Sequence, residues 1–176
     1  MSTGAQIRVA GPRDAAALLR LKQRLDQETS FMLLEPGERD TRVDRLAAEL
    51  DDIAQSGNSA VIVAESVGEL TGYVEVRGGA FRRNRATGYL VIGVLAQASG
   101  HGVGTELLAE AKRWAVAHGL HRIELTVMAD NQRAIGLYER LGFTVEGRRT
   151  QCLLVGGRFA DELYMAVILP GRAAGA

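Results

Sequence analysis

The sequence predicts a mixed α/β (α+β) domain whose central sheet is mainly antiparallel, with one parallel strand pair at its centre. Strand-like segments at residues 59–65, 70–77 and 87–95 follow one another with short connections, which is typical of an antiparallel meander. Residues 87–128 then run strand, helix, strand, and a right-handed crossover places these two strands parallel in one sheet. Two strand patterns around Gly156-Gly157 predict a final hairpin.

The bulk properties of the chain limit its class. Its 176 residues, 47% of them hydrophobic, have the size of one domain, so we expect residues 1–176 to form a single domain. Twenty-one basic and twenty-one acidic residues cancel, which argues against nucleic acid or an anionic membrane as the main partner. Cys152 has no second cysteine to pair with, and neither a signal-peptide pattern nor a long apolar run is present. We therefore expect a cytoplasmic protein.

The first half of the chain predicts one strand and two helices before the meander. Residues 6–10 read as the strand, and Asp14 is expected to cap a helix that carries Leu18, Leu21 and Leu25 on one face. Residues 31–40 should form a loop. Thr41 is expected to cap a second helix, which Gly57 ends. The apolar residues of this second helix keep helical spacing: Val43, Leu46, Ala47, Leu50, Ile53 and Ala54.

The second half predicts a helix, a strand, a helix and the hairpin. Gly119 ends the first of these helices, and residues 121–128 alternate as a strand does. Asn131, preceded by an aspartate, is expected to cap the next helix. Its inward face should consist of Ala134, Leu137, Tyr138 and Leu141. The hairpin strands are expected at residues 143–155 and 158–169.

A glycine-rich run joins the central strand to its helix. Gly100-His101-Gly102-Val103-Gly104 opens directly onto an amphipathic segment with Val103, Leu107, Leu108, Ala111 and Ala115 on one face. A helix N-terminus presents unpaired N–H groups and partial positive charge, and glycines let phosphate oxygens approach those groups. The run therefore predicts a site for an anionic, phosphorylated ligand.

Three general interpretations of this glycine run are available. A P-loop is excluded because Thr105 and Glu106, rather than Lys and Ser/Thr, follow Gly104. A dinucleotide fingerprint stays open, since Glu124 lies about twenty residues further on, although the third glycine comes early and the unit lies in mid-chain. A glycine turn that only lets helix and strand pack closely is the third interpretation.

Two motifs in order resemble those of the GCN5-related N-acetyltransferase (GNAT) family. The first is Gln/Arg-x-x-Gly-x-Gly/Ala, which matches literally from Gln97 but fits better from Ser99, because Leu107 and Leu108 then follow the last glycine at the usual distance. The second is Asn131-x-x-Ala134-x-x-Leu137-Tyr138-x-x-x-Leu141-Gly142-Phe143. Ser99 replaces a long side-chain donor, so we expect backbone amides to carry most of the pyrophosphate contact.

The resemblance implies acetyl-CoA as cosubstrate, no metal, and a definite set of contacts. Pantetheine is expected to pair with the central strand where it parts from residues 121–128, and a strand N–H near residues 92–94 would stabilise the thioester oxygen. The implied cofactor-binding residues are Ile92, Val94, Leu95, Ser99, Gly100, His101, Gly102, Val103, Gly104, Thr105, Asn131, Ala134 and Tyr138. No metal-ligand spacing is present in the sequence.

Tyr138 is the predicted general acid, since in many relatives this tyrosine protonates the departing thiolate. Reference pKa values of about 10 for tyrosine and about 8.5 for a thiol make that transfer uphill by only about 2 kcal/mol. The identity of the general base stays open, because Thr126 occupies the position where relatives carry a glutamate. Glu75, Glu124 and Tyr89 are the candidates, directly or through water.

The expected activity is direct acetyl transfer from the thioester to a primary amine in a ternary complex. Acidic residues around the 31–40 loop, with Glu35 and Glu38 foremost and Tyr89 nearby, predict binding of a small cationic amine or an amino-acid-like acceptor. A protein N-terminal acetyltransferase and a catalytically silent CoA-binding module are the alternatives. A homodimer also stays open.

Overall fold

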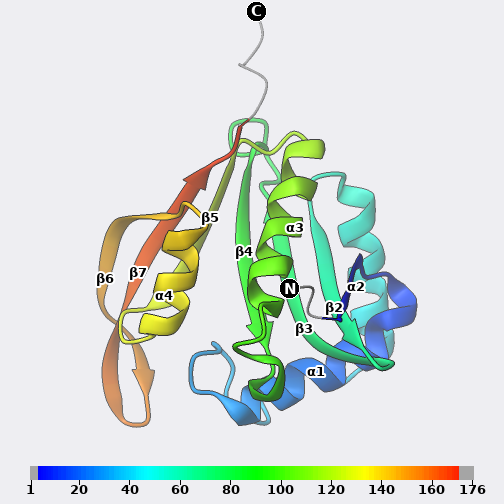
Figure 1. The fold of residues 1–176 in the computed structure, drawn as a ribbon, viewed down its shortest axis with the longest axis horizontal. Helices are drawn as coiled ribbons and strands as arrows, with labels where there is room; N and C mark the ends of the chain where they lie inside the picture. Colours follow the sequence, from blue (N-terminus) through cyan, green and yellow to red (C-terminus); the bar gives the residue numbers. More distant parts are fainter. Residues whose placement is uncertain (1–3, 171–176) are drawn as a thin grey trace, which may run out of the picture.

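The computed structural model describes residues 4–170 and confirms the predicted fold class (Figure 1). The elements follow in the order β1 (Gln6–Val9), α1 (Ala15–Glu28), α2 (Val43–Ser56), β2 (Ala60–Ser66), β3 (Glu69–Gly78), β4 (Thr87–Val94), α3 (Val103–Ala117), β5 (Arg122–Met128), α4 (Gln132–Arg140), β6 (Thr144–Val155) and β7 (Arg158–Ile168). Short 3-10 helices, η1 (Pro12–Asp14) and η2 (Ala96–Ala98), precede α1 and follow β4. The expected single domain of residues 1–176 stays a prediction, because residues 1–3 and 171–176 lie outside the described part.

The described strands form one seven-stranded sheet in the order β1-β2-β3-β4-β5-β7-β6. The β4/β5 pair is parallel and the other neighbouring pairs are antiparallel, as the meander and crossover patterns predicted. Helices α3 and α4 lie on one face of the sheet, and α1 and α2 lie on the other (Figure 1). None of the helices within residues 4–170 has the length and apolar character that a membrane crossing requires.

Helix α3 is buried along the face that the sequence predicted. Val103, Leu107, Leu108, Ala111 and Ala115 all belong to the core between this helix and the sheet. Gly102 is the N-cap residue and has φ +89, a left-handed conformation that a residue with a Cβ rarely adopts. The chain therefore turns sharply from the glycine loop into α3, which fixes where the helix N-terminus points.

The parallel pair at the sheet centre is short. β4 and β5 pair only from Thr87↔Arg122 to Tyr89↔Glu124, whereas β4 stays paired with β3 up to Val94. β5 in turn pairs with β7 along its whole length, from Arg122 to Met128. The two strands consequently diverge toward their C-terminal ends, and the α1–α2 loop lies at the open end (Figure 1).

Helix capping differs from expectation at the two N-terminal helices. The N-cap of α2 is Arg42 rather than Thr41, and the Asp40 carboxylate accepts the Arg42 backbone N–H at 3.0 Å. Asp14 precedes α1, yet its carboxylate accepts hydrogen bonds from Arg8 and from the Gly11 N–H instead of capping that helix. A carboxylate gains more from a charge-assisted pair with arginine than from a neutral amide alone.

Two predicted apolar faces are also only partly buried. In α2, Leu50 and Ile53 are buried, whereas Val43 and Ala54 are exposed because this helix covers the outer strands and not the sheet centre. In α4, Ile135 joins Tyr138 as a buried residue although the sequence placed it off the inward face. The other predicted α4 residues are half-buried at the margin of the core: Ala134, Leu137 and Leu141.

One buried ion pair ties the α1–α2 loop to α1. The Asp26 side chain is 2% exposed, and its two carboxylate oxygens accept hydrogen bonds from Arg39 Nε and Nη2 at 2.6 and 2.7 Å. This bidentate contact fixes the end of the loop against the helix that precedes it. The Asp40–Arg42 pair at the start of α2 is exposed by contrast.

We predict that Arg39→Gln lowers the free energy of unfolding by about 3 kcal/mol, because it leaves the buried Asp26 carboxylate without its charged partner. Arg42→Gln is the matched control and should leave the stability unchanged, since exposed ion pairs contribute little. Urea unfolding followed by circular dichroism measures both. Equal unfolding midpoints for the two variants would contradict the anchoring role of Arg39.

Candidate active site

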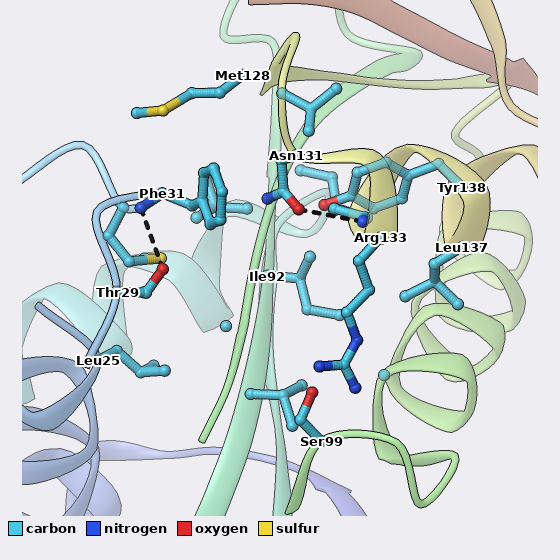
Figure 2. Close-up of a pocket in the computed structure, with 18 of the residues that line it drawn as sticks. Leu25, Thr29, Phe31, Ile92, Ser99, Met128, Asn131, Arg133, Leu137 and Tyr138 are labelled. Atoms are coloured by element: carbon cyan, nitrogen blue, oxygen red, sulfur yellow. Dashed lines mark hydrogen bonds between the residues drawn. The ribbon is translucent and has the colours of Figure 1, made fainter. Parts of the chain in front are cut away.

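A cavity of about 880 Å³ opens where β4 and β5 diverge. Its walls come from the end of α1 and the following loop, the C-terminal halves of β4 and β5, the glycine loop with the start of α3, α4, and the β6–β7 hairpin. Figure 2 shows residues of these segments facing one another across the cavity. Elements that are far apart in the sequence are therefore brought to one site by the gap in the sheet.

The glycine loop lies at one end of this cavity. Ser99, Gly100, Gly102, Gly104 and Thr105 line it, so the first-turn amides of α3 border the same space. Gln97 and His101 instead line a separate, smaller cavity on the other side of the loop. The glycines of both motif registers line the main cavity, so the first residue separates the registers: Ser99 lines this cavity and Gln97 does not.

Two predicted cofactor residues of this region lie elsewhere. His101 is turned toward the smaller cavity, and Val103 is buried in the core beneath α3. Val103 belongs to the buried face of α3, and His101 lies between two glycines with left-handed backbone, Gly100 and Gly102. Their side chains are thus not part of the main cavity.

The backbone of β4 presents free edges to the cavity. Leu95 N–H donates to Thr71 O and Gly79 N–H donates to Thr87 O, so the odd-numbered residues of β4 bond to β3. The N–H and C=O groups of Ile92 and Val94 point away from β3, toward the side on which β5 lies. β5 no longer pairs with β4 at these two residues. Ile92 and Val94 line the cavity, whereas Leu95 is fully buried on the opposite face of the sheet and its N–H is used.

Helix α4 supplies a capped N-terminus and a tyrosine. The Asn131 side chain accepts the Ala134 N–H at 3.2 Å, which confirms the predicted cap, and both residues line the cavity. The Tyr138 ring points from α4 toward the same space (Figure 2), and the residue is 7% exposed. Burial, and secondly the nearby Tyr89, raise the pKa of the Tyr138 hydroxyl well above its usual value. This hydroxyl therefore stays protonated at neutral pH.

Tyr89 and Thr126 form a hydroxyl pair across the diverging strands. Tyr89 lies on β4 and Thr126 on β5, and their oxygens are 2.8 Å apart. Both residues line the cavity. Thr126 thus places a neutral hydroxyl where relatives carry a glutamate. Of the predicted base candidates, Tyr89 lines the cavity, and Glu75 and Glu124 do not.

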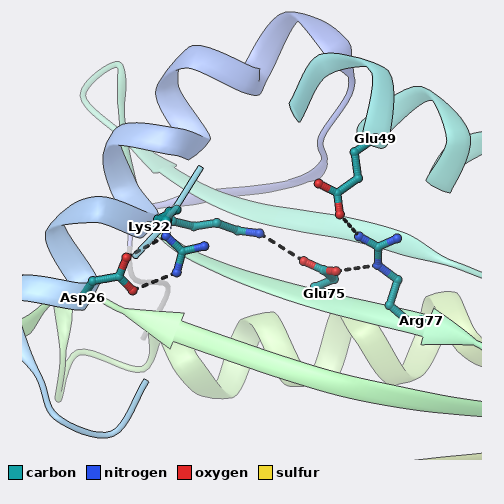
Figure 3. A network of polar contacts seen from close by, with 6 residues as sticks. Lys22, Asp26, Glu49, Glu75 and Arg77 are labelled. Atoms are coloured by element: carbon teal, nitrogen blue, oxygen red, sulfur yellow. Dashed lines mark hydrogen bonds and ion pairs between the residues drawn. The ribbon is translucent and has the colours of Figure 1, made fainter. Parts of the chain in front are cut away.

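Glu75 does not reach the cavity. It lies on β3 beneath α1, where Lys22 Nζ is 3.1 Å and Arg77 Nε 2.5 Å from its carboxylate oxygens, and Arg77 also pairs with Glu49 (Figure 3). Burial acts to raise the pKa of Glu75, but the two cations outweigh it and hold the pKa below the usual value. A carboxylate held ionised by two cations is a poor general base, so the interpretation of Glu75 as the base is corrected to a structural role.

The other predicted carboxylates are likewise absent from the cavity wall. Glu124 is paired with Arg122 at 3.0 Å on the part of β5 that is still bonded to β4. Glu38 accepts the Glu35 N–H at 2.9 Å, so these two residues fold back on their own turn. The loop instead turns the apolar residues Phe31, Met32 and Leu33 to the cavity.

Sequence reasoning missed four charged residues that line the cavity: Arg133, Arg140, Arg149 and Glu162. Arg133, in the first turn of α4, reaches over the glycine loop, where its Nη2 atom is 3.4 Å from the position of a Cβ added to Gly100 (Figure 2). Arg149 and Glu162 line the cavity from the β6–β7 hairpin. Arg133 lies within the second motif and could have been noticed there, whereas nothing in the sequence brings the hairpin to this site.

The described residues contain no group of three or more His, Cys, Asp or Glu side chains that could hold a metal ion. The polar groups at the cavity are backbone amides, the hydroxyls of Tyr89, Thr126 and Tyr138, and the charged groups named above.

Comparisons with known proteins agree with this geometry. A model described as the acetyltransferase (GNAT) family matches residues 23–143. The chain is 31% identical over 129 residues to the L-methionine sulfoximine/L-methionine sulfone acetyltransferase of Pseudomonas aeruginosa, which covers 72% of this chain and 75% of that one.

Solved structures give the same result. A GNAT-family acetyltransferase from Streptococcus pneumoniae superposes with a TM-score of 0.90 at 31% identity, over 94% of this chain and 99% of that one. A putative acetyltransferase from Salmonella typhimurium, solved with its cofactor acetyl-CoA, superposes with a TM-score of 0.86 at 26% identity, over 98% of both chains. The chain therefore belongs to the GNAT family and is an acetyltransferase that uses acetyl-CoA.

Proposed function

We propose that the protein transfers the acetyl group of acetyl-CoA directly to the primary amine of an amino-acid-like molecule. The observation that carries the transfer is the meeting of the α3 N-terminus, the turned-out β4 edge and the Tyr138 ring at one cavity. The acceptor class rests on the relative from Pseudomonas aeruginosa, which is named for acting on methionine derivatives. The apolar wall of the α1–α2 loop supports an acceptor of amino-acid size over a polyamine.

The cofactor roles follow from the polarity of each wall. Amides of residues 102–105 and the α3 dipole bind the pyrophosphate, and the Arg133 guanidinium adds a positive charge beside it. The amide-bearing pantetheine arm pairs with the β4 groups that no longer meet β5. Asn131 and Ala134 bound this arm from α4.

The chemistry requires one bond to form and one to break. The neutral amine attacks the acetyl carbonyl carbon, and the resulting oxyanion accepts a hydrogen bond from a β4 N–H at Ile92 or Val94. The C–S bond then breaks, and the CoA thiolate takes the proton of the Tyr138 hydroxyl. The amine gives up its own proton to water bound by the Tyr89–Thr126 hydroxyl pair, and Tyr138 regains a proton from solvent, which leaves an amide, CoA and the enzyme in its starting state.

The raised pKa of Tyr138 has two consequences for this step. A weaker acid makes proton transfer to a free thiolate more costly, but the same apolar surroundings destabilise the thiolate and raise the pKa of the bound thiol. The proton therefore moves between two groups that burial affects in the same direction. Since Tyr138 stays protonated, turnover should rise with pH as the amine deprotonates, without a decline below about pH 10.

An acceptor panel tests the proposed function. Release of CoA thiol is measured with L-methionine, L-methionine sulfone, free aromatic amino acids, spermidine, an aminoglycoside and a peptide with a free N-terminus. We expect the highest kcat/KM among the free amino acids. Turnover confined to the peptide would support N-terminal acetylation of proteins instead.

We predict that Tyr138→Phe lowers kcat by about 10²-fold, the usual scale of general-acid loss, and leaves acetyl-CoA binding unchanged because the ring is retained. Steady-state kinetics and calorimetric titration with acetyl-CoA measure the two quantities. An unchanged kcat would assign Tyr138 to packing alone.

Arg133→Gln should raise the KM for acetyl-CoA about 10-fold, as expected for one charge-assisted hydrogen bond, with little change in kcat. Arg113→Gln serves as the control, since Arg113 is exposed on α3, pairs with Glu110 and does not line the cavity. If both variants bind acetyl-CoA as the unchanged protein does, Arg133 has no part in phosphate binding.

A further inference from the structure

The β6 strand is interrupted where it borders the cavity. Its pairing with β7 shifts between Arg149 and Leu153, and Gln151 inside this bulge has φ +51, an uncommon conformation for a residue other than glycine. The Asp161 carboxylate accepts the Gln151 N–H at 2.7 Å and also binds Arg148. The bulge is therefore held by side-chain contacts, and Arg149 and Leu153 on its two sides both line the cavity.

The Arg149 guanidinium is oriented by two contacts. Its Nη1 atom donates to Glu162 Oε2 at 2.7 Å, and its central carbon lies 5.7 Å from the centre of the Tyr164 ring. Within residues 4–170, Nε and Nη2 of Arg149 make no further hydrogen bond, and the side chain is 43% exposed. A fixed guanidinium with unused donors at a cavity wall is suited to bind a carboxylate.

Glu162 also keeps an unused atom. The residue is 8% exposed, and its Oε2 atom receives the contacts from Arg149 and from Cys152 Sγ. Oε1 has no hydrogen-bond partner within residues 4–170. Every side-chain oxygen in that range that is sealed from solvent does have a partner, so Oε1 is not sealed from solvent. Oε1 is therefore accessible to solvent in a residue that lines the cavity, and it can accept a hydrogen bond from an ammonium group.

The surroundings of this ion pair are apolar. Phe31 is 44% and Leu33 75% exposed, and both line the cavity together with Met32 and Leu153. Large exposed apolar residues gathered around a cavity indicate an occupant with apolar surface of its own. Arg149 and Glu162 are the charged residues that the β6–β7 hairpin contributes to the cavity lining, and they form one ion pair.

We infer that the Arg149–Glu162 pair is the recognition site for a free, zwitterionic α-amino acid with an uncharged side chain. The α-carboxylate binds the unused donors of Arg149, the α-ammonium binds Glu162 Oε1 before it is deprotonated, and the side chain packs against Phe31, Met32 and Leu153. This inference rests on the proposed function and specifies its acceptor. A polyamine and a protein N-terminus both lack the α-carboxylate, so neither satisfies Arg149.

The test compares L-methionine with 3-(methylthio)propylamine, which has the same side chain and amine but no carboxylate. L-Methioninamide, with a neutral amide in place of the carboxylate, is the second probe. We expect kcat/KM for L-methionine to exceed that for either probe by about 10-fold or more, the scale of hydrogen bonds to a charged group. Equal kcat/KM values for the three compounds would overturn the inference.

Variants then assign the preference to Arg149. Arg149→Lys keeps the positive charge beside Glu162 but loses the planar fork, and Arg149→Gln removes the charge. Both should lower the ratio of kcat/KM for L-methionine to kcat/KM for 3-(methylthio)propylamine by about 10-fold or more. Arg158→Gln is the control, since this arginine is exposed at the start of β7 and does not line the cavity. A loss that is equal for both acceptors would show that Arg149 has only a structural role.

Direct binding separates failure of this inference from failure of the proposed function. Calorimetric titration of L-methionine into the CoA-loaded protein should show binding that Arg149→Lys weakens and Arg158→Gln does not. If no amine is acetylated but this binding is present, the proposed function fails and the recognition site stands. If amines are acetylated and L-methionine binding is absent, the recognition site is overturned and the transferase activity stands.

Discussion

The parting of β4 from β5 after three residue pairs is the constraint on which the rest of the site depends. Each strand keeps its other partner, β3 or β7, so the sheet opens without losing its frame. The gap turns the polar edge of Ile92 and Val94 outward, and it gives the α3 N-terminus and Tyr138 a shared cavity. A continuous parallel ladder would have used these backbone groups and left no room for a pantetheine arm.

The ionised groups of the protein are mostly committed to holding this frame. Lys22, Glu75 and Arg77 join α1 to β3, and Asp26 with Arg39 fixes the loop that forms one cavity wall. The proposed cofactor binding and chemistry therefore rely on backbone amides, the α3 N-terminus, Arg133 and the hydroxyls of the cavity. Such groups need little reorganisation during the reaction, which favours stabilisation of a developing oxyanion.

The hairpin illustrates a different use of irregular backbone. A bulge of β6, held by Asp161, brings Arg149 and Leu153 to the same wall as Glu162 on β7. Arg149 and Leu153 are four residues apart and would share one face of a regular strand as well, but β7 spans only two residues between their partners Glu162 and Ala160, so the bulge takes up the extra residues of β6. The cofactor end of the cavity thus depends on a helix N-terminus, and the proposed acceptor end depends on a distorted strand.

The sequence by itself determined the strand and helix order, the buried face of α3, the Asn131 cap and the glycine loop, because period, turn residues and capping are local properties. It could not decide which carboxylates reach the cavity. The positions of Glu75 and Glu124 on their strands are compatible with a functional role. In the folded chain, however, Glu75 is paired with Lys22 and Arg77, and Glu124 is paired with Arg122. Likewise, only the tertiary structure joins Arg133 to Gly100 and the hairpin to the α1–α2 loop. Contacts between distant segments depend on how the sheet is ordered and where it opens, and no local pattern of residues encodes either.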